Sequence, residues 1–342
     1  MPNSMASAVN GSWSRSLGLC ERIFSPETRE PSIRSGGPMH IGICLPNYGR
    51  ASSPEAIREV AQAAEALGFD SLWTTDHILV PTAHYEPYGR IFETWTTLAY
   101  VAALTQRIRL GTSILLLGLR NPVLVAKQAA TLDQLSNGRL ILGIGAGWLA
   151  REFENLGVSF RGRIRFLEEG IVLMRTLWTS PRPRFQGRFF RIEDAVFEPL
   201  PVQPGGPPIW IGGNTEAAVR RAARLGDGWH PVGLDPETLR QRVARLREWA
   251  QGRSIPVVCR MYIALDSQLP PVYTSPTGER RMRLTGSEEQ ILEGLRTLRD
   301  AGADGVILTF EAPSVDAQIQ QMRRFADLRA QLAQLRDPSE SS

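Results

Sequence analysis

An aspartate and a histidine stand side by side where a short apolar run of the chain ends. The run covers 71–75, and Asp76 and His77 follow it directly. Such a run predicts a buried strand whose last residues emerge at a loop. Because histidine titrates near physiological pH, the pair is a candidate for proton transfer. The structural alternative is that Asp76 caps a turn and His77 only packs in the loop.

Glycines recur at the ends of three further apolar runs, in the stretches LGTSI, GIGAG and IGGN. Glycine lets a flat ligand or a phosphate approach the backbone closely. The third stretch precedes a predicted helix, whose free N–H groups favour an anion. GIGAG resembles a dinucleotide fingerprint only in part, since no clean helix start and no acidic residue follow at the required distance. The alternative for all three is that they permit tight turns.

Apolar runs and amphipathic segments alternate from residue 40 onward, and this order predicts the fold. The expected strands are 40–45, 71–75, 109–113, 140–145, 209–212, 228–231, 257–264 and 305–309. The expected helices are 54–67, 94–105, 122–135, 164–178, 216–225, 236–251, 287–301 and 314–335. Eight strand–helix units predict a single TIM (β/α)8 barrel over 39–336, with chemistry at the carboxyl ends of its strands. We expect a disordered extension at 1–38 and a polar tail at 337–342.

Three connections are too long for ordinary turns: 76–93, 179–208 and 266–286. The first and third fall on the face where the strands end, so they are placed to cover a pocket. The second falls on the opposite face, and its RFQGRFFRI stretch predicts a small hairpin that turns at Gln186 and Gly187.

Composition narrows the classes of partner. The chain has 39 basic and 35 acidic residues, and every basic residue except Lys127 is arginine. Charges of both signs alternate along the helices, so nucleic-acid binding is not expected. Every apolar run is shorter than a bilayer requires, which argues against a membrane segment. Cys20, Cys44 and Cys259 lack metal-ligand spacing, so we expect no metal site and a reduced, cytoplasmic setting.

Longer motifs carry a resemblance to a known family. They are SLWTTDH, RIRLGTSILLL, GRLILGIGAGWLAREFENLGV, PPIWIGGNTEAAVRRAARLGDGW and GADGVIL, and they span about residues 40 to 335. With these motifs the chain resembles the bacterial luciferase-like monooxygenase superfamily. Within it, the chain is similar to the branch that uses the deazaflavin coenzyme F420. The resemblance implies a β/α barrel with the cofactor ring across its open end.

The resemblance also assigns residues. Asp76 would contact the deazaflavin ring, and His77 would face the substrate beside it. Ser113 and Ile114 would form a bulge with a non-prolyl cis peptide behind the ring, and Gly212 and Gly213 would hold the cofactor phosphate. The full set of cofactor contacts that it implies is Asp76, Thr112, Ser113, Ile114, Gly145, Ala146, Gly147, Gly212, Gly213 and Asn214.

One departure from the family concerns the substrate. The F420-dependent sugar-phosphate dehydrogenases carry an acidic residue where this chain has Trp148. They also use lysines for the substrate phosphate, and Lys127 falls in a predicted helix. Glucose 6-phosphate is therefore not the expected substrate. Trp73, Trp148 and His230 are candidate substrate contacts, although both tryptophans could equally be core packing.

Three hypotheses follow. The first is an F420-dependent oxidoreductase that transfers a hydride between the deazaflavin C5 and a small organic substrate, with His77 as general acid or base. The second is an FMN-dependent luciferase-like monooxygenase. The third is a deazaflavin-binding protein without turnover. The resemblance also makes a homodimer the expected assembly.

Overall fold

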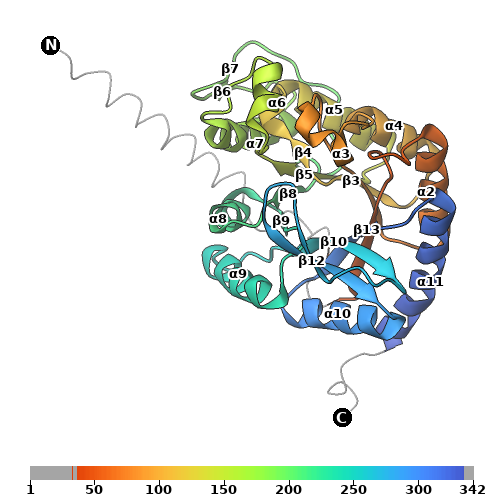
Figure 1. The fold of residues 1–342 in the computed structure, drawn as a ribbon. Helices are drawn as coiled ribbons and strands as arrows, with labels where there is room; N and C mark the ends of the chain where they lie inside the picture. Colours follow the sequence, from red (N-terminus) through yellow and green to blue (C-terminus); the bar gives the residue numbers. More distant parts are fainter. Residues whose placement is uncertain (1–32, 34–36, 335–342) are drawn as a thin grey trace.

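Parallel strands, each followed by helical structure, form a ring with the helices outside it (Figure 1). The computed structural model describes residue 33 and residues 37–334. Around the ring the strands are β1 (His40–Cys44), β2 (Ser71–Thr74), β3 (Arg109–Thr112), β5 (Leu140–Gly145), β8 (Ile209–Gly212), β9 (Gly228–His230), β10 (Val258–Leu265) and β13 (Gly305–Phe310). Parallel bridges from Trp229 to Val257 and from Val232 to Arg260 join β9 to β10. These bridges close the ring, and the predicted barrel is confirmed.

The outer helices begin and end close to the predicted positions. They are α2 (Pro54–Ala66), α4 (Thr94–Leu104), α5 (Pro122–Leu135), α7 (Arg163–Thr179), α8 (Glu216–Leu225), α9 (Pro236–Trp249), α10 (Glu288–Asp300) and α11 (Val315–Gln334). Side-chain caps fix several of the starts, as at Ser53, Thr215 and Asp235. The predicted capping box of Ser287 and Gln290 is present.

Two tryptophans fill the inside of the barrel. The rings of Trp73 and Trp210 stack with their centroids 5.0 Å apart. Glycines make room for them, since a Cβ at Gly42 would lie 2.6 Å from Trp73 Nε1 and one at Gly111 would collide with the same ring. Ile33 is 8% exposed and packs in the same apolar cluster. The fully packed interior leaves the strand ends as the place for a ligand.

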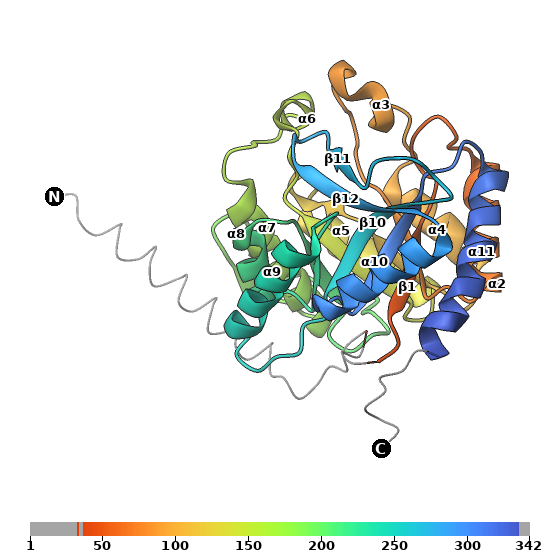
Figure 2. The ribbon, with the colours of Figure 1, turned by 60° about the horizontal axis from the view of Figure 1, so that its bottom comes forward.

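The connections between the barrel strands and the outer helices carry structure of their own. Short helix α3 (Tyr85–Tyr88) and strand β11 (Val272–Thr274) belong to two of the long connections, and short helix α6 (Ala150–Asn155) lies between β5 and α7. All three lie at one end of the barrel, at the top of Figure 2. The segment 266–286 was expected as a plain connection, but β11 and β12 (Arg280–Gly286) form an antiparallel hairpin there, and β12 pairs with β10. The predicted hairpin in 179–208 is confirmed as β6 (Phe185–Gln186) and β7 (Arg191–Ile192).

Some predictions fall outside the described part of the chain. The expected disorder of 1–38 concerns mostly residues that the structure does not describe, but Ile33 belongs to the described part and is packed. The tail 337–342 and Cys20 also lie outside it. Every helix between residues 37 and 334 is too short or too polar to cross a lipid bilayer.

Candidate active site at the open end of the barrel

His77 is held by an acid from a distant segment. Its Nδ1 lies 2.8 Å from Oε2 of Glu152 on α6, and both side chains are buried. The other carboxylate oxygen accepts the backbone N–H groups of Ile78 and Leu79 at 2.7 and 3.2 Å. Burial would raise the pKa of Glu152, but these hydrogen bonds hold it below its usual value. An ionised Glu152 favours the tautomer in which Nδ1 carries the proton, which leaves Nε2 for a ligand.

Asp76 is occupied by a different partner. Its two oxygens accept a bidentate pair from Arg120 at 2.7 and 2.8 Å, and the Leu116 N–H donates to it at 2.8 Å. Burial raises the pKa of Asp76, against the opposing influence of Arg120. Asp76 and His77, the predicted proton-transfer residues, are therefore each bound to a partner far away in the sequence, and their catalytic role stays a prediction. Asp76 anchors Arg120 and the backbone at Leu116.

The turn after β3 has the backbone that the resemblance implies. The peptide bond between Ser113 and Ile114 is cis, as predicted, and β4 (Leu115–Leu116) follows it and pairs with β5. The Ile114 side chain then lies across two strand ends. A Cβ at Gly212 would stand 2.6 Å from its tip, and one at Gly145 would collide with it. These glycines let an apolar side chain lie flat at the open end of the barrel, which suits a planar ring.

The segment before α8 combines an open backbone with a fixed side chain. Gly213 has a φ of +120°, a conformation that other residues rarely adopt. Asn214 does not point its amide at a ligand, since it donates to the Val232 carbonyl and accepts the Val232 N–H, at 2.8 and 2.9 Å. Thr215 caps the helix. The Gly213 N–H donates to the His230 carbonyl at 3.4 Å and the Gly213 carbonyl accepts from Trp229 Nε1 at 2.9 Å, so the start of α8 is what remains for a phosphate.

Two of the predicted substrate contacts lie deeper than expected. Trp73 is 0% exposed in the barrel interior and donates its Nε1–H to Ser71. His230 stacks on Trp73, and both of its ring nitrogens are used, Nδ1 with the Val258 carbonyl at 2.6 Å and Nε2 with Ser113 Oγ at 2.8 Å. Burial lowers the pKa of His230 to about 4, so this ring is neutral. As a correction to the predicted substrate contacts, both residues support Ser113 and the core from within.

Trp148 has a different position, in an aromatic wall beside His77. The ring of Tyr88 lies 4.6 Å from His77, and Trp148 lies 6.1 Å from His77 and 5.2 Å from His84, as centroid distances. Gly147 and Ala146 precede Trp148 and are partly exposed. Nδ1 of His84 is buried without a hydrogen-bond partner. The wall offers an apolar surface with a few polar atoms next to the free side of His77.

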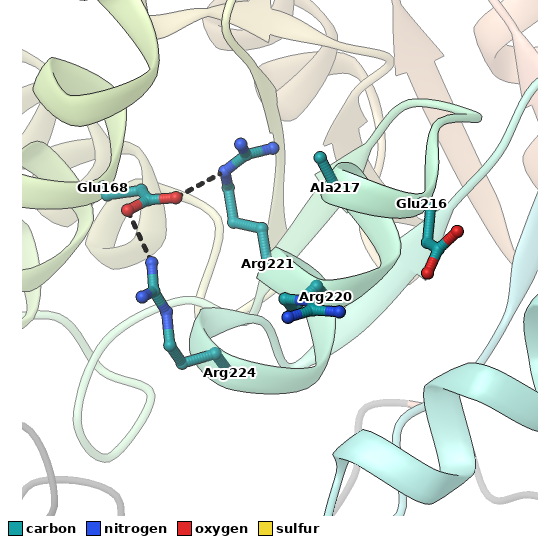
Figure 3. A pocket seen from close by; sticks show the side chains of 6 residues that line it. All are labelled: Glu168, Glu216, Ala217, Arg220, Arg221 and Arg224. Carbon is teal, nitrogen blue, oxygen red and sulfur yellow. Dashed lines mark hydrogen bonds and ion pairs between the residues drawn. The ribbon is translucent and has the colours of Figure 1, made fainter.

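A hollow of about 380 Å³ lies elsewhere, on the outer surface at α7 and α8 (Figure 3). Glu168 bridges Arg221 and Arg224 there, at 3.1 and 2.5 Å. The hollow contains none of the predicted site residues. Within residues 37–334 and at residue 33, acidic, histidine and cysteine side chains form no cluster that could hold a metal ion.

Sequence reasoning missed the residues that complete the site. Glu152 holds His77, and Arg260 on β10 donates to the Ser113 carbonyl at 2.7 Å. The sequence gives only a weak signal for Glu152, because it stands between Arg151 and Glu154 in a charged stretch. Arg260 stands in the middle of a strand where apolar residues are expected. Neither signal indicates which residue is the hydrogen-bond partner, and only the structure shows it.

Comparisons with known proteins show relatives of this chain. The chain is 34% identical to an uncharacterised protein of Mycobacterium tuberculosis over 270 residues, covering 74% of this chain and 84% of that one. It is 37% identical to an F420-dependent glucose-6-phosphate dehydrogenase of Amycolatopsis mediterranei over 180 residues, 52% of this chain and 53% of the relative.

Solved structures share the fold at low identity. One is an F420-dependent secondary alcohol dehydrogenase in complex with an F420-acetone adduct, with a TM-score of 0.72, 21% identity, and coverage of 85% of this chain and 98% of that one. Another is the oxygenating constituent of 3,6-diketocamphane monooxygenase from Pseudomonas putida in complex with FMN, with a TM-score of 0.68, 16% identity and coverage of 87% and 99%. Residues 39–268 match the family described as luciferase-like monooxygenase, and the chain belongs to that family.

Proposed function

We propose that this protein is an F420-dependent oxidoreductase that transfers a hydride between C5 of the deazaflavin ring and a small organic substrate. The observation that carries the proposal is the state of His77. One ring nitrogen is fixed by Glu152, and the other has no partner among the described residues. The imidazole lies beside a wall of aromatic rings. A histidine held in this way is suited to proton transfer with a bound molecule.

The open end of the barrel fits a planar tricyclic ring. Ile114 lies flat between Gly145 and Gly212, where any side chain on either glycine would collide with it. The start of α8 beside Gly213 suits the phosphate of the cofactor tail. When bound, the coenzyme would accept or donate the hydride.

His77 would handle the proton that accompanies the hydride. In the oxidation of an alcohol-type carbon, Nε2 takes the hydroxyl proton while the hydride leaves the carbon, and in a reduction it returns that proton. Such a role contributes about 10² to 10⁴ in rate. Glu152 keeps the proton on Nδ1 and the ring in place, so it acts as a positioning residue.

The names of the relatives support the cofactor, whereas this chain's own residues argue against a sugar phosphate as substrate. The dehydrogenase of Amycolatopsis mediterranei and the secondary alcohol dehydrogenase both use F420 by their names. The chain's single lysine, Lys127 on α5, donates to the Glu198 carbonyl at 2.5 Å and is therefore engaged away from the open end. Trp148 adds apolar surface where sugar-phosphate enzymes have an acid. We therefore propose a small, largely apolar substrate.

The test is a titration of the purified protein with F420 and, separately, with FMN, followed by fluorescence quenching. Submicromolar binding of F420 with weak binding of FMN would support the proposal, and a substrate screen by deazaflavin absorbance would follow. Preference for FMN would contradict it and favour the monooxygenase, for which oxygen uptake with a flavin reductase is the assay. Binding of F420 without turnover of any screened substrate would favour a binding protein.

The assembly and location remain predictions. We propose a homodimer in a cytoplasmic setting, acting on a small molecule. Light scattering on the purified protein tests the assembly: a mass of one chain would contradict it.

A further inference from the structure

Arg260 is a buried cation at the open end whose described partners are all neutral. It is 7% exposed. Its Nη1 donates to the Ser113 carbonyl at 2.7 Å and to Ser113 Oγ at 3.4 Å. Its Nη2 donates to the Tyr48 hydroxyl at 3.0 Å, and its Nε to Thr309 Oγ1 at 3.3 Å. The fifth N–H bond, on Nη2, has no partner among the described residues.

Three carboxylates near the open end form ion pairs with residues other than Arg260. Asp76 pairs with Arg120, Glu152 with His77, and Glu311 with Arg283 at 2.6 Å. Within the described part of the chain, no acidic side chain forms an ion pair with Arg260.

Nearby titratable groups do not supply the missing negative charge. Burial raises the pKa of the Tyr48 phenol well above its usual value, so this group stays protonated. Burial also raises the pKa of Tyr88, whose ring stacks on Tyr48 with the centroids 5.8 Å apart. His230, which shares Ser113 with Arg260, is neutral. The guanidinium therefore keeps its full charge.

The other buried arginines are compensated. Arg175 pairs with Asp227 at 2.8 Å, and Arg221 with Glu168 at 3.1 Å. Arg139 has no carboxylate, but it donates to the carbonyls of Ala102 and Thr105 at the C-terminal end of α4, where the helix dipole is negative. A buried charge without such compensation is costly. Arg260 is the exception among the four, and it lies where a ligand would enter.

The surroundings of Arg260 connect it to His77. Tyr48 accepts from Arg260 and lies 3.4 Å from the Tyr262 hydroxyl, oxygen to oxygen. Tyr48 stacks on Tyr88, and Tyr88 contacts His77. A chain of contacts through Tyr48 and Tyr88 thus links Arg260 to His77.

We propose that Arg260 and Tyr48 form a binding site for an anionic oxygen of a planar, delocalised group. Two molecules carry this chemistry: a substrate with a carboxylate, or the deazaflavin ring, whose pyrimidine oxygens gain negative charge on reduction. The second source rests on the function proposed above, whereas the first does not. The free N–H on Nη2 can donate to one such oxygen, and the positive charge of the guanidinium stabilises the negative charge on it.

The first experiment uses the cofactor-free protein and sodium benzoate at constant ionic strength. Benzoate should raise the melting temperature of the wild type. R260Q should weaken benzoate binding roughly ten- to a hundredfold. R221Q is the matched control, since it removes a buried arginine far from the open end and should keep the benzoate effect. Equal benzoate binding by wild type and R260Q, or none by either, would overturn the proposal as regards a carboxylate.

A second measurement needs no variant. Crystals of the wild type soaked with 4-bromobenzoate should place the carboxylate against Arg260, with the bromine located by its anomalous signal. This keeps the proposal testable if R260Q does not fold. A carboxylate at another place only would contradict a carboxylate site.

The third experiment separates the two sources. If the ring supplies the anionic oxygen, R260Q should weaken binding of reduced F420 at least about tenfold more than binding of oxidised F420. If the substrate supplies it, R260Q should bind both forms like the wild type, and benzoate should bind the cofactor-loaded wild type but not loaded R260Q. Unchanged binding of both cofactor forms and of benzoate would overturn the proposal. Failure of the wild type to bind F420 would reject the proposed function and leave the benzoate result standing.

Discussion

Two buried arginines show how the two ends of the barrel differ. At the closed end, Arg139 makes five hydrogen bonds, one for each N–H, and four of them go to backbone carbonyls. At the open end, Arg260 makes four, two of which are longer than 3.2 Å. Every N–H of Arg139 thus has a partner within the protein. Arg260, in contrast, lacks one hydrogen-bond partner and has no carboxylate beside it among the described residues.

Two histidines give a second contrast between the ends. His40 at the start of β1 is buried, its Nε2 lies 2.7 Å from Ser71 Oγ, and burial lowers its pKa to about 4. His77 at the end of β2 is hydrogen-bonded at Nδ1 to the buried carboxylate of Glu152 and lies beside the rings of Tyr88 and Trp148. The difference teaches that the partners of a histidine, more than its residue type, mark the candidate site.

The largest expected effect separates these two histidines. H77Q should lower turnover by about 10² to 10⁴ while F420 binding changes little, because only the proton-transfer group is lost. H40Q, the control at the closed end, should leave the turnover of folded protein unchanged. Steady-state kinetics with any substrate found in the screen measures both. Similar losses of turnover in H77Q and H40Q would contradict the assignment of catalysis to the open end of the barrel.

The next effect concerns the ion pair that anchors the turn after β3. R120A leaves Asp76 buried without its partner and should cost about 3–5 kcal/mol in unfolding free energy. Denaturant unfolding measures this. R50A is the control, because Arg50 pairs with Glu86 at the surface and its loss should not be measurable. A small effect of R120A would mean that water replaces the guanidinium and that the open end is looser than described.

Acid should destabilise the protein through its neutral buried histidines. In the folded chain the pKa of His40 and of His230 is about 4, against 6.5 when unfolded. The unfolded chain therefore binds more protons between these values, and unfolding free energy falls as the pH drops from about 6.5 to 4. Each residue contributes up to about 3 kcal/mol to this loss.

Unfolding curves across this range for wild type and H40Q test the point. The variant should lose less stability on acidification. Parallel curves would show that His40 is not held neutral.

The smallest expected effect compares two glycines. G111A forces a Cβ against the rigid Trp73 ring and should cost about 1–3 kcal/mol. G145A meets only the tip of the Ile114 side chain, which can rotate, so its cost should be under about 1 kcal/mol. Thermal unfolding measures both. A reversed order would mean that Ile114 is the more rigid of the two side chains.

Much of the fold was predictable because it depends on local patterns. Periodicity, caps and glycines place each barrel strand and outer helix within a few residues. The cis peptide bond between Ser113 and Ile114 was expected from the family resemblance and is present. The glycines of β5 and β8 stay predicted cofactor contacts, because motif and backbone chemistry coincide there.

The missing parts of the site depend on partners distant in sequence. Glu152 reaches His77 from 75 residues away, and Arg260 reaches Ser113 from 147. Trp73 was misjudged for a related reason, since the room for its ring comes from Gly42 and Gly111 on the neighbouring strands. A pattern read along one segment contains none of this information.

The most direct test of the account is the affinity of F420 for the wild type, G145V and H40Q, measured by calorimetry in parallel. G145V would displace the Ile114 side chain at the open end, and H40Q alters only the closed end. The account predicts that G145V binds at least about tenfold more weakly while H40Q binds like the wild type. Wild-type affinity in G145V, or equal losses in both variants, would contradict the claim that the open end of the barrel holds the deazaflavin ring.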